Sequence, residues 1–395
     1  MLRIRDFRLI LTAYGTTHLG DDLAIVALTI RVQELTGSGL AVSALLIAEL
    51  LPRLLFAPLG GLIIDRLETV RVLVVASIIQ AGLAASLAFV EALPGLLVLS
   101  FLLGTAAAVT NPALFALVPL AAGEERVPEA NARLELARYA GGAVGPLLAG
   151  VLSARLGTRF ALLVDAGTFL VIAGCAAALR LRRAAAPLGE GEAPPRAREG
   201  IAFIRGDPVL QLTFVVLALS VVFAAIDNVA EVFFAKDVLR AGDIGYGALL
   251  TAWILGMIVG ATLTARRIRP GGLGGAIPLA AVVGGGAVAV AAALPALPLA
   301  LAMFVVGGAA NGLENAGMRT LMHRRTPEHL RGRVFAAYAG LLSGAQIAAL
   351  GMGGVLVAVA GARGSLLVAG AGSVLVGAIG FLWYLRVRTR KTVAA

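Results

Sequence analysis

Residues 128–141 read P-E-A-N-A-R-L-E-L-A-R-Y-A-G, and residues 327–340 read P-E-H-L-R-G-R-V-F-A-A-Y-A-G. The two stretches lie 199 positions apart in a chain of 395 residues, and six of their fourteen positions are identical. The shared Pro, Glu and Tyr carry more weight than the shared Ala and Gly, because small residues are abundant throughout this chain. A peptide that recurs once in each half indicates duplication of one structural unit, which constrains the whole architecture.

The composition is that of a membrane protein. Hydrophobic residues make up 59% of the chain and charged residues only 14%, with a mean hydropathy of +0.93. Soluble domains carry roughly 25% charged residues. Apolar runs of about 20 residues recur, and each is long enough to cross a bilayer as a helix. We therefore expect an all-α polytopic membrane protein, and its 49 glycines suit closely packed transmembrane helices. In such a chain the internal repeat favours a transporter built from two similar bundles.

The net charge of +10 does not indicate nucleic-acid binding, because the basic residues lie in short loops between apolar spans. A single cysteine, Cys175, lies within an apolar span, so no intramolecular disulfide is expected. The basic start of the chain precedes a long apolar run that Asp21 and Asp22 interrupt and that no small-residue cleavage site follows. We expect this first helix to be retained rather than removed as a signal peptide.

The apolar runs predict twelve transmembrane helices in two pseudo-symmetric bundles of six. They are expected near 7–31, 40–64, 71–91, 95–119, 132–154, 158–179, 209–234, 244–266, 272–294, 296–318, 333–358 and 364–385. The Pro- and charge-rich stretch 180–208 is expected to be a cytoplasmic linker. It separates an N-terminal bundle at 1–179 from a C-terminal bundle at 209–395.

The distribution of basic residues predicts the orientation. With the N-terminus in the cytoplasm, the tails and inner loops hold 26 of the 33 basic residues and the outer loops hold six. This bias is the positive-inside pattern, so both termini are expected in the cytoplasm of a plasma-membrane protein. Both copies of the repeated peptide then begin in an inner loop and continue into the fifth helix of their bundle.

Ionisable residues within spans cost free energy and usually mark pathways or proton relays. Glu49 and Arg53 are four residues apart, so they share one face of the second helix. They form either a neutralised structural pair or a charge switch, and Arg53 is a candidate for lining the substrate cavity. Asp21 and Asp22 lie near mid-depth of the first helix and point about 100° apart, so one of them is expected to face the cavity. For Asp165 we expect a structural role.

The seventh and tenth helices carry three further acids. Asp227 and Glu231 share a helical face, and Glu231 is expected near the outer surface, paired with Lys236 or Arg240. Glu314 lies in a polar cluster with Asn311 that would either bind substrate or lock the inner gate. Together with Asp21, Asp22 and Glu49, these acids are the candidates for proton coupling. Candidate residues of the substrate cavity, besides Arg53, are Phe223, Asn228, Trp253, Asn311 and Gln346.

The chain carries no phosphate-binding loop of the type G-x-x-x-x-G-K-[ST] and no soluble domain to hold one. Energy for transport would therefore come from a gradient, with no cofactor. A carboxyl that alternates between a dry and a wet environment changes its proton affinity, and this change is the physical basis for proton coupling.

Residues 61–71 read G-L-I-I-D-R-L-E-T-V-R and resemble the loop motif G-x-x-x-D-R-x-G-x-R-[RK] of the major facilitator superfamily. Gly61, Asp65, Arg66 and Arg71 match, whereas Glu68 replaces the second glycine. The resemblance implies that this loop is a conformational latch between the two bundles on the cytoplasmic side.

The fifth helix resembles the end of the antiporter motif of that family at Gly141, Gly145 and Pro146. Further stretches, among them L-G-D-D at 19–22, A-E-L-L-P at 48–52 and D-A-G-T-F-L at 165–170, resemble proton-driven exporters of macrolides and of the siderophore enterobactin. The fourth helix lacks the intramembrane Arg found in many drug–proton antiporters. Proton coupling would therefore depend on the acids named above.

These observations together predict a secondary transporter, not an enzyme, that exports amphipathic or hydrophobic small molecules in exchange for protons. We expect it to work by alternating access and to be monomeric in the lipid bilayer. The alternatives within transport are a lysophospholipid facilitator and a siderophore exporter. A membrane-embedded enzyme is a remote alternative, because the three His residues are scattered and no metal or nucleophile cluster is evident.

Overall fold

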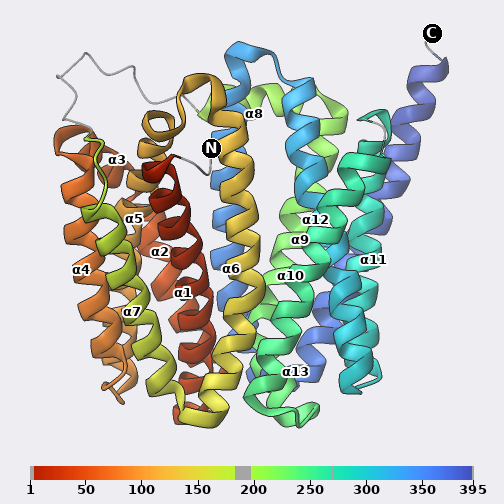
Figure 1. Cartoon of the computed structure of the whole chain (residues 1–395). Helices are drawn as coiled ribbons and strands as arrows, with labels where there is room; N and C mark the ends of the chain where they lie inside the picture. Colours follow the sequence, from red (N-terminus) through yellow and green to blue (C-terminus); the bar gives the residue numbers. More distant parts are fainter. Residues whose placement is uncertain (1–3, 183–196, 269, 394–395) are drawn as a thin grey trace. The chain divides into compact units, whose positions relative to one another are not determined.

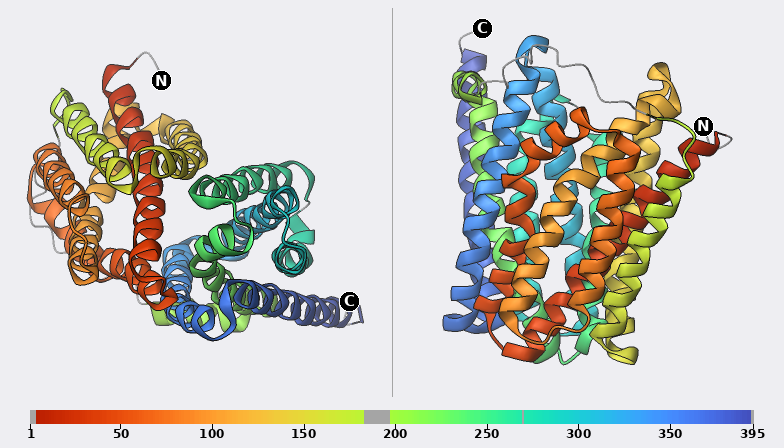
Figure 2. Two further views of the ribbon diagram at one scale, coloured as in Figure 1. Left: turned by 90° about the horizontal axis from the view of Figure 1, so that it is seen from below. Right: turned by 90° about the vertical axis from the view of Figure 1, so that its left-hand side faces the viewer.

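The computed structural model describes residues 4–182, 197–268 and 270–393, and all regular elements in these residues are helical. The chain divides into two compact units, Met1–Glu190 with Gly242–Thr251, and Gly191–Ala241 with Ala252–Ala395. Within each unit the helices lie side by side (Figures 1 and 2). A helix satisfies its own backbone hydrogen bonds, as a segment in hydrocarbon must. The predicted all-α membrane fold is confirmed.

The first unit contains seven α-helices and the start of α10. They are α1 (Arg5–Thr36), α2 (Gly39–Leu55), α3 (Ala57–Arg66), α4 (Thr69–Leu87), α5 (Leu93–Ala122), α6 (Val127–Leu156) and α7 (Thr158–Ala177). The connections are tight. Gly37 ends α1 with a φ of 61°, and its N–H donates to the Gln33 carbonyl at 2.8 Å. The side chain of Ser38 then accepts a hydrogen bond from the Ala41 amide and begins α2.

The second predicted span is not one straight helix. It consists of α2 and α3, which meet at Phe56 with a bend of 48°. Pro58 lies in the first turn of α3, where its missing N–H costs no helical hydrogen bond. The prediction of an uninterrupted helix over 40–64 is therefore wrong, because a proline so close to mid-span favours a new helix start.

The second unit contains α8 (Ala197–Gly206), α9 (Pro208–Phe233), most of α10 (Gly242–Arg267), α11 (Leu273–Ala293), α12 (Leu297–Arg325) and α13 (Glu328–Val393). A π-helical turn, Phe234–Val238, prolongs α9. Short 3-10 turns precede α6 at Glu124–Arg126 and α11 at Pro270–Gly272.

Helix α13 holds both of the last two predicted spans. Gly361 has a φ of 66° and a ψ of 175°, so α13 consists of two helices that meet at a kink at this residue. Among the described residues, eight helices are long and apolar enough to cross a membrane, and the bent pair α2–α3 makes a ninth. Since α13 contains two predicted spans, and α1 and α6 match two more, the helices account for all twelve.

Several helices are longer than predicted because their polar ends continue beyond the apolar span. Helix α1 extends to Thr36, α6 begins at Val127 and α12 ends at Arg325. The predicted linker 180–208 contains an unexpected helix, α8, while residues 183–196 lie outside the described part of the chain. Ile204 of α8 is buried in an apolar cluster of the second unit, and Glu199 forms an ion pair with Arg333 of α13.

The second unit braces the start of α9 with a charged cap. Asp207 accepts hydrogen bonds from the amides of Val209 and Leu210 at 2.9 and 3.2 Å, and Arg325 of α12 donates to the same carboxylate at 2.8 Å. Burial raises the pKa of Asp207, but these hydrogen bonds outweigh it and hold its pKa below the ordinary value. The first unit has no equivalent, since Ile4 precedes α1 and provides no side-chain cap.

Both units contain the same arginine clamp. Arg159 Nε of α7 donates to the Ala88 carbonyl at the end of α4 at 3.1 Å. Arg363 Nε of α13 donates to the Ala292 carbonyl at the end of α11 at 2.9 Å. Each pair is separated by 71 residues, and both members shift by 204 positions between the units, from 159 to 363 and from 88 to 292. The clamp is an independent sign of duplication, and it satisfies carbonyls that a helix end leaves unpaired.

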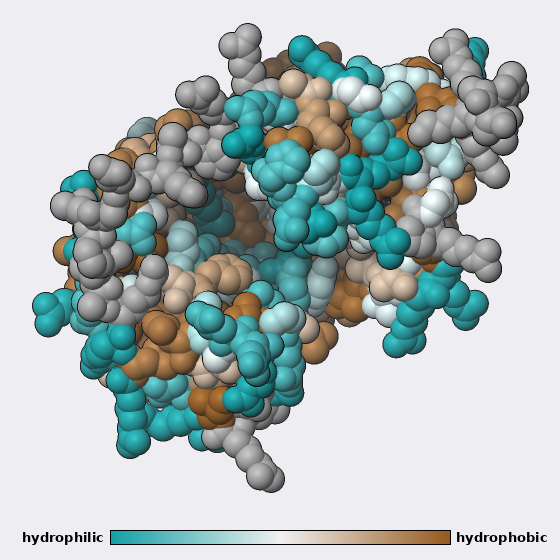
Figure 3. Space-filling model, turned by 90° about the horizontal axis from the view of Figure 1, so that it is seen from above, coloured by the Kyte–Doolittle hydropathy of each residue, from teal (hydrophilic) through white to brown (hydrophobic). Residues whose placement is uncertain are grey.

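The outward surfaces of the helices are suited to lipid. Large apolar side chains are exposed along their lengths, for example Val359 at 82% and Leu136 at 69%. Hydrophilic side chains gather instead at helix ends, as Figure 3 shows for one face of the molecule. This distribution is the one expected of a multi-pass membrane protein.

Candidate functional site

The first unit gathers carboxyls around Arg53. Arg53 Nη2 of α2 donates to Glu49 Oε1 at 2.6 Å, and Asp21 Oδ2 of α1 lies 4.0 Å from the same nitrogen. The three side chains are 30, 16 and 19% exposed, respectively. The pair expected from the i, i+4 spacing therefore extends to a second helix, and one cation is shared between two acids.

Asp21 and Asp22 face different neighbours, as their positions on adjacent residues of a helix require. Asp21 points to Arg53, whereas Asp22 packs against α6, where a Cβ on Gly145 would lie 3.0 Å from the Asp22 Cβ. Two polar side chains lie close to these acids along α1, Thr17 and His18. The Thr17 hydroxyl donates to the Ala13 carbonyl, and His18 Nε2 is buried without a hydrogen-bond partner in the described part of the chain.

Asp165 of α7 lies in the core of the same unit and is 1% exposed. The Thr168 hydroxyl is 2.7 Å from the Asp165 carbonyl and 3.3 Å from its Oδ1, while Oδ2 has no hydrogen-bond partner among the residues that the structure describes. Gly20 of α1 leaves the space that both side chains occupy.

The residues of the loop motif lie at one end of this unit. Asp65, Arg66 and Arg71 are exposed, and a Cβ on Gly61 would meet no heavy atom within 4 Å. Glu68, which replaces the motif glycine, lies 3.7 Å from Arg71 Nε and 3.6 Å from Arg182 Nε. The departure from the motif therefore adds a local ion-pair network.

The motif of the fifth span is a close-packing surface on α6. A Cβ on Gly141 would lie 2.9 Å from the Leu19 amide nitrogen, and one on Gly145 would lie 2.8 Å from the Leu19 carbonyl oxygen. The Pro146 carbonyl in turn contacts Gly247 at the start of α10. These glycines let α6 approach its neighbours at backbone distance.

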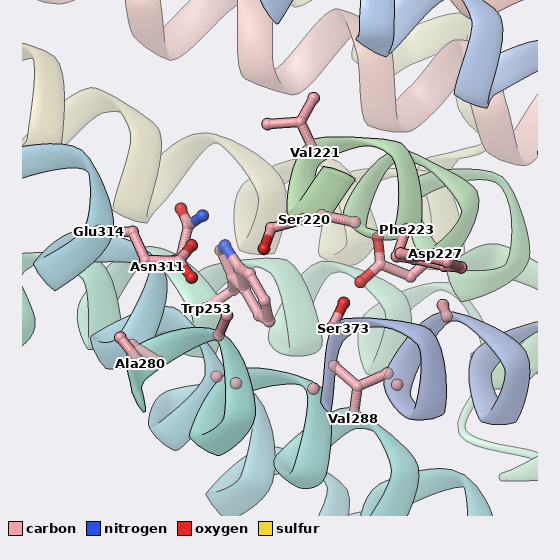
Figure 4. Close-up of a pocket in the computed structure, with 18 residues that line it drawn as sticks. Ser220, Val221, Phe223, Asp227, Trp253, Ala280, Val288, Asn311, Glu314 and Ser373 are labelled. Atoms are coloured by element: carbon pink, nitrogen blue, oxygen red, sulfur yellow. The ribbon is translucent and has the colours of Figure 1, made fainter. Parts of the chain in front are cut away.

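The second unit has a partly open cavity of about 50 Å³ among α9, α10, α11, α12 and α13 (Figure 4). That volume is enough for several water molecules. Two carboxyls line it, Asp227 of α9 and Glu314 of α12, and each residue is 5% exposed. The lining residues described by the structure include no Lys, Arg or His. The acids of this unit are thus arranged without the cation that accompanies those of the first.

Three of the predicted cavity residues, Phe223, Trp253 and Asn311, line this cavity. Asn228 is exposed on α9 and Gln346 is half-buried on α13, and neither belongs to the lining. The lining also includes Ser220 and Ser373, which the sequence did not single out, because nothing distinguishes them from other serines in apolar spans.

Glu231, expected near the outer surface and paired with Lys236 or Arg240, is buried. It is 4% exposed, and its Oε2 has no hydrogen-bond partner in the described part of the chain. The π-helical turn Phe234–Val238 continues the helix beyond it, past the predicted end at 234.

A multi-pass helical fold with acids buried in both units defines a membrane transporter. Residues 10–344 match the Major Facilitator Superfamily, and the chain belongs to this family. It is 29% identical over 386 residues to the multidrug efflux pump Tap of Mycolicibacterium fortuitum, with 94% of each chain covered. It is also 26% identical over 380 residues to the uncharacterised MFS-type transporter YfiS of Bacillus subtilis (strain 168), covering 94% of this chain and 91% of that one.

Solved structures agree on the fold. A mutant of the nucleoside transporter NupG is 13% identical and superposes with a TM-score of 0.78, covering 96% of this chain and 99% of that one. A bacterial homologue of the iron transporter ferroportin, in an inward-facing state, is 18% identical with a TM-score of 0.69 and covers 97% and 99%. At these identities the likeness concerns the fold alone.

Proposed function

We propose that this transporter exports amphipathic or hydrophobic small molecules, of the multidrug or macrolide-like kind, in exchange for protons by alternating access. The efflux direction is supported by the similarity to a multidrug efflux pump along nearly the whole of both chains. Similarity to a pump does not by itself specify the coupling ion, so the argument for protons depends on the acids.

The observation that carries the proposal is the carboxyl excess around Arg53. Glu49 and Asp21 share that one cation, and Asp22 lies beside Asp21 on the same helix. When one of these acids is protonated, it loses its charge and its electrostatic attraction for Arg53. The guanidinium then pairs with the other acid. Because the acids belong to α1 and α2, such an exchange of partners would change the contact between these helices.

The proposed orientation puts both termini in the cytoplasm of the plasma membrane, as the concentration of basic residues in the inner loops predicts. Replacing Cys175, the only native cysteine, by Ser gives a background for single-cysteine labelling in intact cells. A cysteine near residue 240 should react with an impermeant maleimide, and one near residue 330 should react only after lysis. The reverse pattern would overturn the orientation, and light scattering of the purified protein would test the expected monomer.

The function is tested in proteoliposomes with an imposed pH gradient. The gradient should drive movement of a lipophilic cation or a macrolide, and collapsing it with an ionophore should reduce the rate at least about tenfold. Transport that runs equally well without the gradient would contradict proton antiport. Parallel assays with a lysophospholipid and a ferric siderophore test the two alternatives, because either could be the preferred substrate of the same scaffold.

The coupling residues are tested by making Asp21→Asn and Asp22→Asn separately. One of them should abolish proton-driven transport while leaving the thermal stability of the protein within a few degrees of wild type. The matched control is Asp237→Asn, which removes an exposed carboxylate beyond α9. If both helix α1 variants keep their proton dependence, the coupling site lies elsewhere.

A further inference from the structure

Most of the side-chain atoms that could bind an ion in the cavity of the second unit are oxygens. Its polar lining consists of the Asp227 and Glu314 carboxyls, the Asn311 amide, the Trp253 indole N–H, and the hydroxyls of Ser220 and Ser373. The described lining contains no Cys, His or Met. Carboxylates, hydroxyls and water are the ligands of hard cations, whereas soft or borderline metals select sulfur and imidazole.

A buried group without a partner points into this cavity. Ser220 is 6% exposed, and its Oγ has no hydrogen-bond partner among the described residues. A buried hydroxyl that lacks a partner is costly, so the Ser220 hydroxyl is available to bind water or an ion in this cavity. Figure 4 shows the Ser220 hydroxyl turned to the space between the two carboxyls.

The charged side chains in the described lining of the cavity, Asp227 and Glu314, are both acidic. Helix α9 contributes Asp227 to the lining, with Glu231 one turn further on, and α12 contributes Glu314. The lining residues from α10, α11 and α13 are Trp253, small or apolar residues and Ser373, none of which titrates near neutral pH. Two carboxylates in a largely buried site whose described lining holds no basic side chain require a cation from solution or remain protonated.

The arrangement favours a monovalent cation. In the view of Figure 4, Asp227 and Ser373 lie at one end of the cavity, Glu314 and Asn311 at the other, and the Trp253 ring between them. Each end therefore provides one carboxylate, too few for a divalent ion such as Ca²⁺, which takes six to eight oxygen ligands, several of them carboxylate. A proton would need neither a water-sized cavity nor an unpaired hydroxyl.

We propose that the cavity binds Na⁺ at its Asp227 end. The Asp227 carboxylate is the anionic ligand, the Ser373 hydroxyl is a neutral ligand, and water held by the Ser220 hydroxyl completes the shell. The Trp253 ring lies between this end of the cavity and the Glu314 end. This binding requires no drug substrate and is independent of the proposed proton antiport.

Trp253 makes the site observable. The chain has two tryptophans, so the variant Trp383→Phe leaves Trp253 as the only one. In the full-length protein in detergent, Na⁺ should change the emission of Trp253 and saturate, with choline replacing Na⁺ at constant ionic strength. An equal concentration of K⁺ should give a response at least about tenfold weaker in affinity. Lowering the pH should weaken Na⁺ binding, because a proton competes for Asp227.

Variants locate the ion. Asp227→Asn should abolish the Na⁺ response, and Ser373→Ala should weaken the affinity about tenfold. The matched control is Asp165→Asn, which removes an equally buried carboxyl in the first unit and should leave the response unchanged. If Asp227→Asn fails to fold, the double variant Ser220→Ala/Ser373→Ala takes its place, because it removes only two hydroxyls.

The proposal is overturned if Na⁺ gives no response beyond choline, if K⁺ responds equally, or if the response persists in Asp227→Asn or in the double serine variant. A change of emission with pH but not with Na⁺ would mean that the cavity holds protons alone, which would also overturn it. Because the measurement uses no substrate and no pH gradient, its failure leaves proton-driven efflux standing, and loss of efflux leaves the sodium site standing.

Discussion

The two units repeat their scaffold but not their electrostatics. Each clamps one helix end with an arginine 71 residues away in the chain. In the first unit the acids surround Arg53, whereas in the second the Asp227 and Glu314 carboxyls line a cavity that has no basic residue. Duplication supplied a common frame, and the charged residues within it have since diverged. The difference implies that a charge removed from one unit will not have the same effect as a charge removed from the other.

The largest difference in stability should be between two glycine variants at positions where helices pack closely. A Cβ on Gly260 of α10 would overlap the Ala309 carbonyl of α12, whereas a Cβ on Gly145 of α6 would lie 2.8 Å from the nearest atom of α1. We expect Gly260→Ala to cost about 3 kcal/mol and Gly145→Ala about 1 kcal/mol, because a Cβ on Gly260 would lie closer to the Ala309 carbonyl oxygen and so overlaps it more deeply. Thermal unfolding in detergent measures both.

The control for this comparison is Gly174→Ala in α7, where a Cβ would meet nothing within 4 Å. Its stability should be unchanged or slightly raised, because Ala is the better helix former. Equal losses at positions 145 and 260 would contradict the expected dependence of the loss on the depth of overlap.

The next largest effect on stability should come from replacing charged side chains. Arg53→Gln leaves Glu49 and Asp21 without their shared cation, and we expect a loss of about 2 kcal/mol, reduced by the partial exposure of the pair. Glu314→Gln removes a buried carboxyl that has no ion pair among the described residues, so its stability should be equal or higher. Both are measured by thermal unfolding at pH 7.

A double variant sharpens this result. Glu49→Gln/Arg53→Gln should recover part of the loss of Arg53→Gln, because no unpaired charge remains at position 49. A loss in Glu314→Gln as large as in Arg53→Gln would contradict the difference between the units.

A smaller effect on stability depends on pH and comes from the Asp207 cap of the second unit. The pKa of Asp207 is held below its ordinary value in the folded protein, so the cap stabilises fully above the unfolded-state pKa of about 3.9. That stability is lost as the pH falls through the lower folded-state pKa. Asp207→Asn should therefore be about 1 kcal/mol less stable than wild type at pH 6, and the gap should close towards pH 3.

The measurement is the difference in unfolding temperature between the two proteins across that pH range. Glu91→Gln, at an exposed residue of the first unit, is the control and should show no such change. A gap that stays constant from pH 6 to pH 3 would show that ionised Asp207 does not provide the stability.

The smallest effect tests the shared scaffold. Arg159→Gln and Arg363→Gln each remove the clamp on one helix end, and each should cost about 0.5–1 kcal/mol. The two losses should agree within measurement error, and the double variant should show their sum. Unequal losses would mean that the geometrically matched clamps differ in strength.

The sequence predicted the elements that depend on apolar length and missed those that depend on local chemistry. Apolar runs sufficed for the twelve spans, and the four-residue spacing of Glu49 and Arg53 sufficed for their pairing. The break at Phe56 was missed because Pro58 adds little to the polarity of its span, although it limits where a helix can continue. The burial of Glu231 was missed because the π-helical turn beyond it leaves no mark in composition. Ser220 and Ser373 became visible only when folding brought α9 and α13 around one cavity.

The turn at Gly361 has a consequence for how the chain is made. One non-helical residue joins the last two spans, so the ribosome delivers them to the membrane with almost no loop between them. They must enter as a hairpin, since neither can wait outside the bilayer while the other inserts. Because this connection is so short, it is a poor place for an epitope tag or a fused domain. Accommodating one would require unwinding a helix on either side.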